Sequence, residues 1–482
     1  MINFRIIARV FSLLLIVEGI MMLLSSGVSY IYAEHATRPL FYSALVTLIS
    51  GAIVFTPVKK IEKVTGKKEG YIVVAGGWIL FAVFGSLPYL FSHSVQTFTD
   101  AFFESLSGFT TTGATIFADV ESLDHGILFW RSMTQWAGGA AIIFISLYVL
   151  PVFRSVYLQL PAADFSGQPS DKIHPRVRDV ALRLLLIYAG LTLAETLLLS
   201  FGGISFFDSL CLSFSTFSTG GFSTMNNSLT SFSGSFVTVV ITICMFLAGI
   251  NMTFIYFGLK GNYKKILGSN EFIFYVLICA VFSILVAMNL IISTDLPFGK
   301  SIVNGAFHVV SLVTTTGFYI KNPLVWSELL LILFFLLMFT GGTTGSASSG
   351  IKSVRLLLVT RNSGFELIRL IHPNAFIPVR LDRKIIPSAT LFNLLVYITL
   401  YFLVICASAM IISLMGYDII TSFSTSASML ANIGPGLGST GPFTGFADMP
   451  FYGKWFMAGL MLMGRLELFT VMVLFTKNFY RR

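Results

Sequence analysis

The sequence predicts an all-α polytopic membrane protein in which four pore repeats surround a central pore, with two extra transmembrane helices at the N-terminus. Three observations predict this fold. Only 11% of the 482 residues are charged, whereas a soluble domain carries about 25%. The apolar runs are long and continuous, unlike the alternating strands of roughly 10 residues in a membrane barrel. Four short glycine loops also recur at nearly even spacing.

The apolar segments come in two lengths. Four amphipathic segments are too short to cross about 30 Å of hydrocarbon, and each leads into a glycine loop: 97–110, 205–217, 299–314 and 418–431. About ten others are long enough to span: 10–33, 40–57, 70–91, 126–150, 180–201, 234–258, 272–293, 325–340 with a polar break, 388–414 and 452–476. The repeating unit is therefore a spanning helix, a half-helix, a glycine loop and a spanning helix.

This order predicts five segments along the chain. A helix pair comes first and the four pore repeats follow, with a glycine-rich interruption at 340–350 inside the third repeat. The predicted boundaries are 1–68 for the helix pair, then 69–160, 161–265, 266–370 and 371–482 for the repeats.

The basic residues predict that both termini are cytoplasmic. If each half-helix enters from outside, the cytoplasmic segments hold nearly all of the 31 Lys and Arg residues, including Lys59, Lys60, Lys63, Arg154 and Lys172. This bias follows the positive-inside rule. The net charge of +9 is then explained by topology, so we expect lipid around the protein and no nucleic acid partner. The exceptions are Arg465, inside a span, and five outer residues: Arg38, Arg131, Lys300, Lys321 and Lys454.

The glycine loops predict a cation filter. They read TTTGA at 110–114, STGGF at 218–222, TTTGF at 314–318 and NIGPG at 432–436. Glycine accepts positive φ, so successive carbonyls can turn toward one axis and replace the water shell of an ion. The half-helices end at these loops, which directs their negative dipole ends at a cation. No loop contains a carboxylate, which favours a monovalent ion over calcium.

A plainer interpretation of the loops is that small residues merely let helices pack closely. Four loops, each after a half-helix and at even spacing, favour the filter. The candidate filter residues are Thr111, Thr112, Gly113, Ser218, Thr219, Gly220, Thr315, Thr316, Gly317, Asn432, Ile433 and Gly434.

The loops resemble the filter sequences of the Trk/Ktr/HKT superfamily of potassium transporters. SGFTTTGAT, STGGFST, VTTTGF and ANIGPG carry the resemblance, which covers essentially the whole chain. The extra N-terminal helices and the NIGPG loop favour the longer Trk type over the shorter Ktr type. The resemblance implies a potassium-selective, channel-like uptake subunit of the bacterial inner membrane. It also implies that K+ passes the carbonyls around Gly113, Gly220, Gly317 and Gly434. A serine at the first position goes with sodium permeation in that superfamily, so Gly113 favours potassium.

Partners are implied by the same resemblance. It implies a homodimer in which each protomer keeps its own pore, and a cytosolic ring of TrkA-like nucleotide-binding regulatory subunits. The chain itself has no Walker motif and no GxGxxG after a strand, so we expect no nucleotide site on it. No cluster of polar catalytic residues stands out, which argues against an enzyme.

A second glycine-rich segment interrupts the span that follows the third loop. The sequence TGGTTGSASSG at 340–350 has four glycines in eleven residues, too many for a stable helix. It is either a tight loop or a mobile plug below the filter, and its resemblance to the intramembrane gating loop of the superfamily favours the plug. The candidate gate residues are Gly341, Gly342, Thr343, Thr344, Gly345, Ser346, Ala347, Ser348, Ser349, Gly350 and Arg465.

Arg465 is the lone cation inside the last span, and an intramembrane charge is a candidate for function. It can pair with Glu467, bind carbonyls of the 340–350 segment, stand in the pore as an electrostatic barrier, or extend to the cytoplasmic interface. Glu104 and Asp208 lie near half-helices, where they either attract cations or serve as caps and buried hydrogen-bonding groups. His308 is expected to be a packed polar residue.

A second functional class also uses broken helices. Proton- or sodium-coupled symporters with alternating access are built from inverted repeats. Here every half-helix enters from the same side in the charge-based topology, so the repeats run parallel. This favours gated conduction, while the choice between passive and ion-coupled uptake stays open at this stage.

Overall fold

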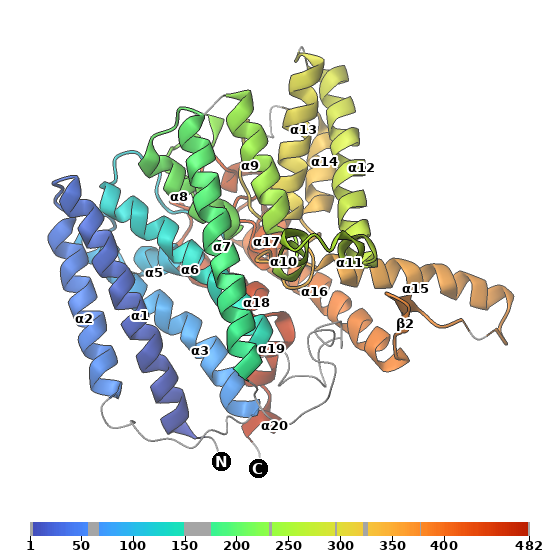
Figure 1. Ribbon diagram of the computed structural model, residues 1–482, viewed down its shortest axis with the longest axis horizontal. Coiled ribbons are helices and arrows are strands. Elements are labelled where there is room, and N and C mark those ends of the chain that lie inside the picture. Colours follow the sequence, from blue (N-terminus) through green and yellow to red (C-terminus); the bar gives the residue numbers. More distant parts are fainter. Residues whose placement is uncertain are drawn as a thin grey trace.

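The computed structural model describes residues 3–55, 67–148, 175–230, 234–294, 296–321, 326–375 and 377–480. The predicted cytoplasmic cations Lys59, Lys60, Lys63, Arg154 and Lys172 lie outside these residues. The described chain is almost entirely helical (Figure 1), so the predicted all-α membrane fold is confirmed.

The elements follow one another in the order shown in Figure 1. They are α1 (Phe4–Ile31), α2 (Thr37–Phe55), α3 (Lys67–Gly85), α4 (Leu87–Phe91), α5 (Phe98–Phe109), α6 (His125–Tyr148), α7 (Pro175–Phe201), α8 (Phe206–Phe217), α9 (Ser235–Ala248), α10 (Met252–Leu259), α11 (Tyr263–Leu267), α12 (Asn270–Ser293), α13 (Phe298–Val313), α14 (Glu328–Leu337), α15 (Ser353–Ile371), β1 (Arg380–Leu381), β2 (Lys384–Ile385), α16 (Ser388–Leu414), α17 (Ile419–Ala431), the 3-10 turn η5 (Gly438–Thr440), α18 (Phe451–Arg465), α19 (Leu468–Leu474) and α20 (Lys477–Tyr480).

Fewer straight spans are present than the sequence predicts. Among the described residues, six helices are long and apolar enough to cross a membrane, and at most eight if two bent pairs count as spans. The predicted spans at 234–258 and 452–476 are each broken, because α9 and α10 meet at 107° and α18 and α19 meet at 115°. At the second break Glu467 adopts a φ of 63°, which no α-helix accommodates.

The four half-helices α5, α8, α13 and α17 begin and end within one residue of the predicted bounds. Side-chain caps start three of them. Thr97 accepts from the Asp100 amide, Ser205 from the Asp208 amide, and Asp418 from the Thr421 amide. Such caps satisfy amides that the first turn leaves free, which is how these short helices begin at defined residues.

The half-helices are held in a closed circle of longer helices. α5 packs between α3 and α6, α8 between α7 and α9, α13 between α12 and α14, and α17 between α16 and α18. In addition, α6 contacts α8, α9 contacts α13, and α18 returns to contact α5. This cyclic packing brings the C-terminal ends of all four half-helices toward one centre.

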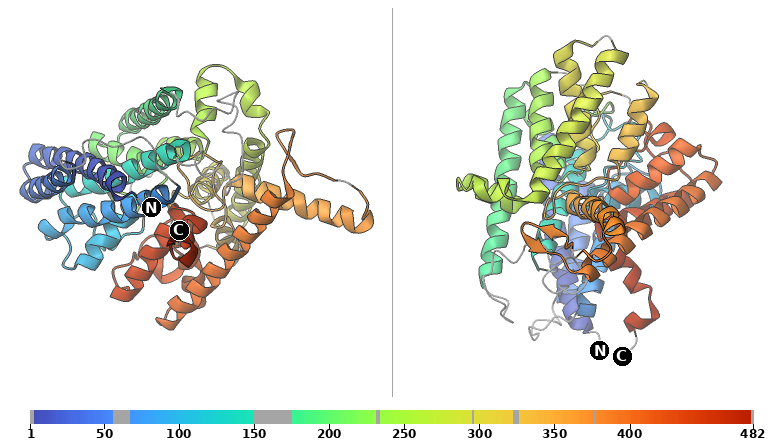
Figure 2. Two further views of the ribbon diagram at one scale, coloured as in Figure 1. Left: turned by 90° about the horizontal axis from the view of Figure 1, so that it is seen from below. Right: turned by 90° about the vertical axis from the view of Figure 1, so that its right-hand side faces the viewer.

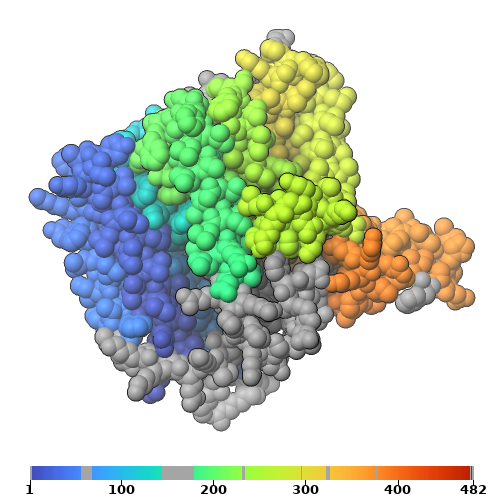
Figure 3. Space-filling view, viewed as in Figure 1, coloured from blue at the N-terminus to red at the C-terminus, as the bar shows by residue number. Residues whose placement is uncertain are grey.

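The N-terminal helix pair and a projecting arm lie at opposite edges of this circle. α1 and α2 pack together along one edge (Figure 1), where the Ser12 hydroxyl donates to the Gly51 carbonyl at 2.8 Å. At the other edge α15 stands away from the bundle (Figure 1, the left panel of Figure 2, and Figure 3), and the β1–β2 hairpin lies beside it. Arg361 Nη1 of α15 donates to the Arg380 carbonyl at 2.8 Å.

Both ends of the chain lie on the same side of the molecule. The Asn3 amide donates to Glu69 Oε1 at 2.9 Å, which places the start of α1 beside the start of α3. The Tyr71 ring, also at the start of α3, packs against the Phe479 ring of α20, with 6.1 Å between the ring centroids. This shared side agrees with the topology that the basic residues predict.

The contact between α1 and α2 generates a prediction. A Cβ at Gly19 would lie 2.6 Å from Leu48 Cγ, whereas at Gly27 of the same helix nothing lies within 4 Å. We expect Gly19→Leu to cost about 1–3 kcal/mol through overpacking and to lower the melting temperature of the purified protein. Gly27→Leu is the matched control, and an equal loss in both variants would contradict the assigned contact.

Candidate functional site: four glycine loops and the segment beneath them

Each half-helix ends in the same backbone turn. In the first three the residue after the C-cap is left-handed, and in the fourth the C-cap Asn432 is itself left-handed, so none of the four is glycine. The amide of the next residue donates to a serine carbonyl inside the helix at 2.8–2.9 Å. This Schellman pattern satisfies carbonyls that the last turn leaves free. The left-handed residues are Thr111, Thr219, Thr315 and Asn432, with φ of 52, 55, 59 and 55°, and the acceptors are the carbonyls of Ser107, Ser215, Ser311 and Ser428.

A glycine with positive φ follows each turn. Its φ is 81° at Gly113, 80° at Gly221, 76° at Gly317 and 98° at Gly434. The structural counterpart of Gly113 in the second loop is thus Gly221, not Gly220 as the sequence predicts. Gly220 occupies the place of Thr112 and Thr316, so the second loop is set one residue later. The physical reason is that positive φ falls on the residue two after the left-handed turn.

The four loops interlock in a ring. A Cβ on Gly113 would collide with the Gly220 carbonyl oxygen of the second loop. The same relation continues around the circle: Gly221 faces the Thr316 oxygen, Gly317 faces the Ile433 oxygen, and Gly434 faces the Thr112 oxygen. Each glycine therefore admits a carbonyl of the next loop, and the fourth loop closes on the first.

Side chains behind the loops hold this ring. The hydroxyl groups of Thr110 and Thr112 are hydrogen-bonded to each other, with 2.7 Å between their oxygens. Asn432 Nδ2 joins the fourth loop to the first by donating to Thr112 Oγ1 at 2.9 Å, and it also donates to the Met461 carbonyl at 2.9 Å. Gln135 of α6 fixes the second loop, because its Nε2 donates to the Gly220 carbonyl at 2.8 Å. Sequence reasoning missed Gln135, which looks like an ordinary polar residue in an apolar span.

The chain leaving each loop is tied back to its own half-helix. The Ile116 amide donates to Glu104 Oε2 at 2.9 Å, and the Ile320 amide donates to His308 Nε2 at 3.4 Å. These two acceptors occupy the same place, nine residues before the loop glycine. In the fourth unit Ser424 Oγ accepts from the Leu437 amide at 2.8 Å. Glu104 is fully buried, so it is a hydrogen-bonding group rather than an open cation trap.

The second unit uses a different carboxylate. Asp208 Oδ1 accepts from Thr224 Oγ1 at 2.7 Å, while its amide donates to Ser205 Oγ at the start of α8. Asp208 is therefore a cap and a tie to the outgoing chain.

An acidic loop after the first unit is tied to the chain that leaves the second. Asp119 Oδ1 accepts from Asn226 Nδ2 at 2.8 Å, and Glu121 Oε1 accepts from the Asn226 amide at 3.0 Å. The hydrogen bond from Asn226 lowers the pKa of Asp119 below its ordinary value. Asp119 therefore keeps its negative charge to a lower pH than a free aspartate.

The glycine-rich segment 340–350 lies directly beneath the third loop. It is non-helical between α14 and α15, and a bridge between Thr340 and Ile351 closes its base. The Ser349 amide donates to Thr315 Oγ1 at 3.0 Å. The segment thus touches a candidate filter residue from the side on which both chain termini lie.

The break between α9 and α10 receives this segment. The Thr343 amide donates to the Gly249 carbonyl at 2.9 Å, and the Asn251 amide donates to Thr343 Oγ1 at 2.6 Å. Glu271, at the start of α12, accepts from the Thr344 amide at 2.5 Å. The polar groups that the helix break exposes are therefore satisfied by the segment itself.

Arg465 binds the opposite side of the segment. Its side chain is 4% exposed, and its Nη1 donates to the Ala347 carbonyl at 2.9 Å and to Ser349 Oγ at 3.0 Å. Glu467 pairs instead with Arg355 at 2.6 Å. Of the interpretations that the sequence left open, the geometry supports carbonyl binding and excludes both a pair with Glu467 and an extended, interfacial Arg465.

Comparison of the chain with known proteins agrees with this geometry. The family model TrkH, described as a cation transport protein, matches residues 41–480. The chain belongs to the TrkH family. One relative in the family, the Trk system potassium uptake protein TrkH of Salmonella typhimurium, is 36% identical over 99% of this chain and 100% of its own length. The Escherichia coli protein of the same name is 35% identical over the same shares. The crystal structure of the potassium transporter TrkH from Vibrio parahaemolyticus aligns with a TM-score of 0.90, 30% identity and full coverage of both chains.

The register of the second loop generates a prediction. Gly221 combines positive φ with a collision against backbone, whereas a Cβ on Gly220 would meet only the Gln135 side chain. We expect Gly221→Ala to abolish ion uptake, because a left-handed alanine costs about 1–2 kcal/mol and its Cβ pushes the third loop away. Gly220→Ala retains more uptake, since a side chain moves more easily than backbone. Greater loss in Gly220→Ala would contradict the shifted register.

Proposed function

We propose that this chain is a potassium-selective, channel-like transporter subunit that mediates K+ uptake across the bacterial inner membrane. The observation that carries the proposal is the ring in which each loop glycine admits a carbonyl of the next loop. Membership of a family of cation transport proteins supports it, as do relatives named as potassium uptake proteins.

The proposed filter selects by carbonyl oxygens. The ring has no carboxylate, so a dehydrated monovalent cation meets only neutral oxygens and the negative ends of four half-helices. K+ is the transported ion and the filter is its only proposed site. The filter residues are Thr111–Gly113, Thr315–Gly317 and Asn432–Gly434, with 219–221 in place of the predicted 218–220.

The proposed gate is the segment 340–350. Its contact with Thr315 supports a position in the ion path below the filter. Arg465 stabilises the closed position through two hydrogen bonds from a charged donor, and Lys352 Nζ adds a third to the Ser348 carbonyl at 2.6 Å. Opening then requires the segment to leave these donors and the α9–α10 break.

The proposed partners act on the cytoplasmic side. The chain forms a homodimer with one pore in each protomer, surrounded by lipid, and a TrkA-like ring of nucleotide-binding subunits controls the gate. The relatives are named as proteins of a Trk system, which supports a multi-subunit assembly. The projecting α15 and the β1–β2 hairpin form a basic arm suited to docking, with Arg361, Arg369, Arg380, Arg383 and Lys384.

A proton-coupled symporter is the second candidate function. Glu18 of α1 and Glu195 of α7 are fully buried inside spans, and their carboxyl oxygens have no hydrogen-bond partner among the described residues. Such groups mark proton paths in pumps and transporters. Uptake that follows an imposed pH gradient, and loses that response in Glu18→Gln or Glu195→Gln, would favour symport over passive conduction.

The proposed filter is tested by uptake of radiolabelled Rb+ into proteoliposomes that contain only this chain. We expect K+ to compete far better than Na+, and Gly113→Ser to reduce that preference because its side chain must displace the Gly220 carbonyl. Gly27→Ala is the matched control, since its Cβ meets nothing within 4 Å. An unchanged preference in Gly113→Ser would count against the ring as the filter.

The proposed gate is tested by basal uptake without any partner. Each hydrogen bond from a charged donor is worth about 1.5–3 kcal/mol, so we expect Arg465→Met or a shortened 341–350 segment to raise basal flux about tenfold or more. Arg183→Met is the control, because Arg183 of α7 donates to the Tyr256 hydroxyl at 3.3 Å and has no hydrogen bond to 340–350 among the described residues. Correctly inserted variants with wild-type flux would rule out a plug.

A further inference from the structure

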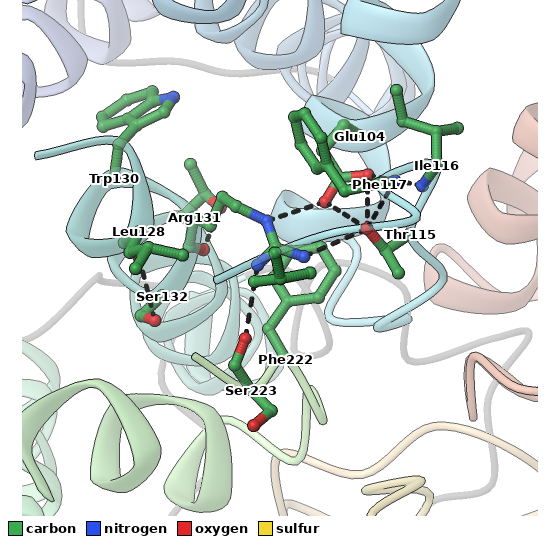
Figure 4. A network of polar contacts seen from close by, with 12 residues as sticks. Glu104, Thr115, Ile116, Phe117, Leu128, Trp130, Arg131, Ser132, Phe222 and Ser223 are labelled. Atoms are coloured by element: carbon green, nitrogen blue, oxygen red, sulfur yellow. Dashed lines mark hydrogen bonds and ion pairs between the residues drawn. The ribbon is translucent and has the colours of Figure 1, made fainter. Parts of the chain in front are cut away.

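One buried ion pair lies behind the first two loops. Arg131 of α6 and Glu104 of α5 are 2% and 0% exposed, and Arg131 Nε donates to Glu104 Oε1 at 2.8 Å. Figure 4 shows the guanidinium between the rings of Phe117 and Phe222. Its centre lies 5.4 Å and 4.2 Å from those ring centroids. Removing two charges from water is costly, so a pair at this depth needs an explanation beyond stability.

The guanidinium joins three separate pieces of chain. Besides Glu104 on the half-helix, its Nη2 donates to Thr115 Oγ1 at 3.1 Å, and its Nη1 donates to the Ser223 carbonyl at 3.3 Å. Thr115 leaves the first loop two residues after Gly113, and Ser223 leaves the second loop two residues after Gly221. The planar fork of one arginine thus sets the spacing between two neighbouring loops.

Glu104 completes the arrangement from the other side. Its two oxygens accept from Thr115 Oγ1 at 3.0 and 3.1 Å, and its Oε2 also accepts from the Ile116 amide at 2.9 Å. The outgoing chain of the first loop is therefore held on one face by Glu104 and on another by Arg131. Both groups are fully engaged, so neither is free to bind an ion.

At two other junctions the outgoing chains meet through neutral groups. Between the second and third units, the Leu229 amide donates to the Tyr319 carbonyl at 3.2 Å and Thr230 Oγ1 donates to the Ile320 carbonyl at 2.5 Å. Between the fourth and first units, the Phe446 amide donates to the Thr115 carbonyl at 2.9 Å. The charged fork that joins the first two outgoing chains is stiffer than these neutral bonds, because charge-assisted hydrogen bonds are roughly twice as strong.

We propose that Glu104 and Arg131 are positioning residues for ion selectivity: their pair fixes the distance between the first and second loops, and with it the fit of the carbonyl ring to K+ over Na+. This inference rests on the proposed function and deepens it. Neither residue touches the ion, and both act through Thr115 and Ser223.

The test uses Arg131→Lys as its main variant. Lysine keeps the charge opposite Glu104, so the protein is expected to fold, but a single ammonium cannot hold Glu104, Thr115 and Ser223 in one plane. We expect the preference for K+ over Na+ in Rb+ competition to fall about tenfold, which corresponds to about 1.4 kcal/mol, while uptake itself persists. Glu104→Gln is the second variant and should lower the same ratio.

A measurement of thermal stability, which does not depend on ion flux, accompanies the competition assay. The melting temperature of each purified protein is measured in K+ and in Na+, since a fitted ion stabilises the folded state. The extra stabilisation by K+ is expected to shrink in both variants. A role in folding alone would lower all melting temperatures equally and leave the ion difference and the uptake ratio at wild-type values, and that result would overturn the inference.

Lys454→Met is the matched control. Lys454 of α18 pairs with Asp100 of the same half-helix α5 at 2.6 Å, with exposures of 8% and 22%, and donates to the Ala447 carbonyl of the fourth outgoing chain at 3.0 Å. Among the described residues it has no hydrogen bond to the outgoing chain of the first or the second loop. Its loss should lower stability and preserve the K+ preference. If the wild type prefers K+ over Na+ and both Arg131→Lys and Glu104→Gln keep that preference, only this inference is overturned. If the wild type itself shows no preference for K+ over Na+, the proposed function is overturned as well.

Discussion

The close approach of each loop glycine to a carbonyl of the next loop is the contact on which the rest of the structure depends. A side chain at any of these glycines would push a neighbouring backbone away, so the loops either fit together or do not form. Non-helical backbone survives in a membrane only when its polar groups are satisfied. The half-helices, their shared C-terminal turns and the circle of packed helices all serve to bring four such loops to one place.

The sequence predicts the half-helices well because their signals are local. A capping residue, an amphipathic run and a terminal glycine loop lie within about 15 residues of each other. The register of the second loop fails because Gly220 and Gly221 are adjacent and sequence alone weighs them equally. The phenylalanine that follows Gly221 and Gly317 is the signal that aligns the two loops correctly. Positive φ at Gly221 then agrees with that alignment.

The break in 234–258 was not predictable from composition, since Gly249 and Asn251 are the only signals for it in an otherwise apolar stretch. The bend at Gly249 forms because Thr343, almost a hundred residues later, binds the exposed carbonyl. The role of Arg131 was hidden for a similar reason. It lies at the outer end of a predicted span and was assigned to the outside by the charge pattern, whereas its partner Glu104 belongs to another helix. Tertiary contacts of this kind leave no trace in hydropathy.

The link between Thr112 and Asn432 has a consequence for how the protein is made. These residues are 320 positions apart in the chain, which a ribosome covers in roughly 16–64 s at 5–20 residues per second. Throughout that time the Thr112 carbonyl of the first loop lacks its partner glycine, Gly434. Biosynthesis must therefore shelter an unfinished ring, and any chain that stops before the fourth loop leaves three polar hairpins open to lipid and to quality-control proteases.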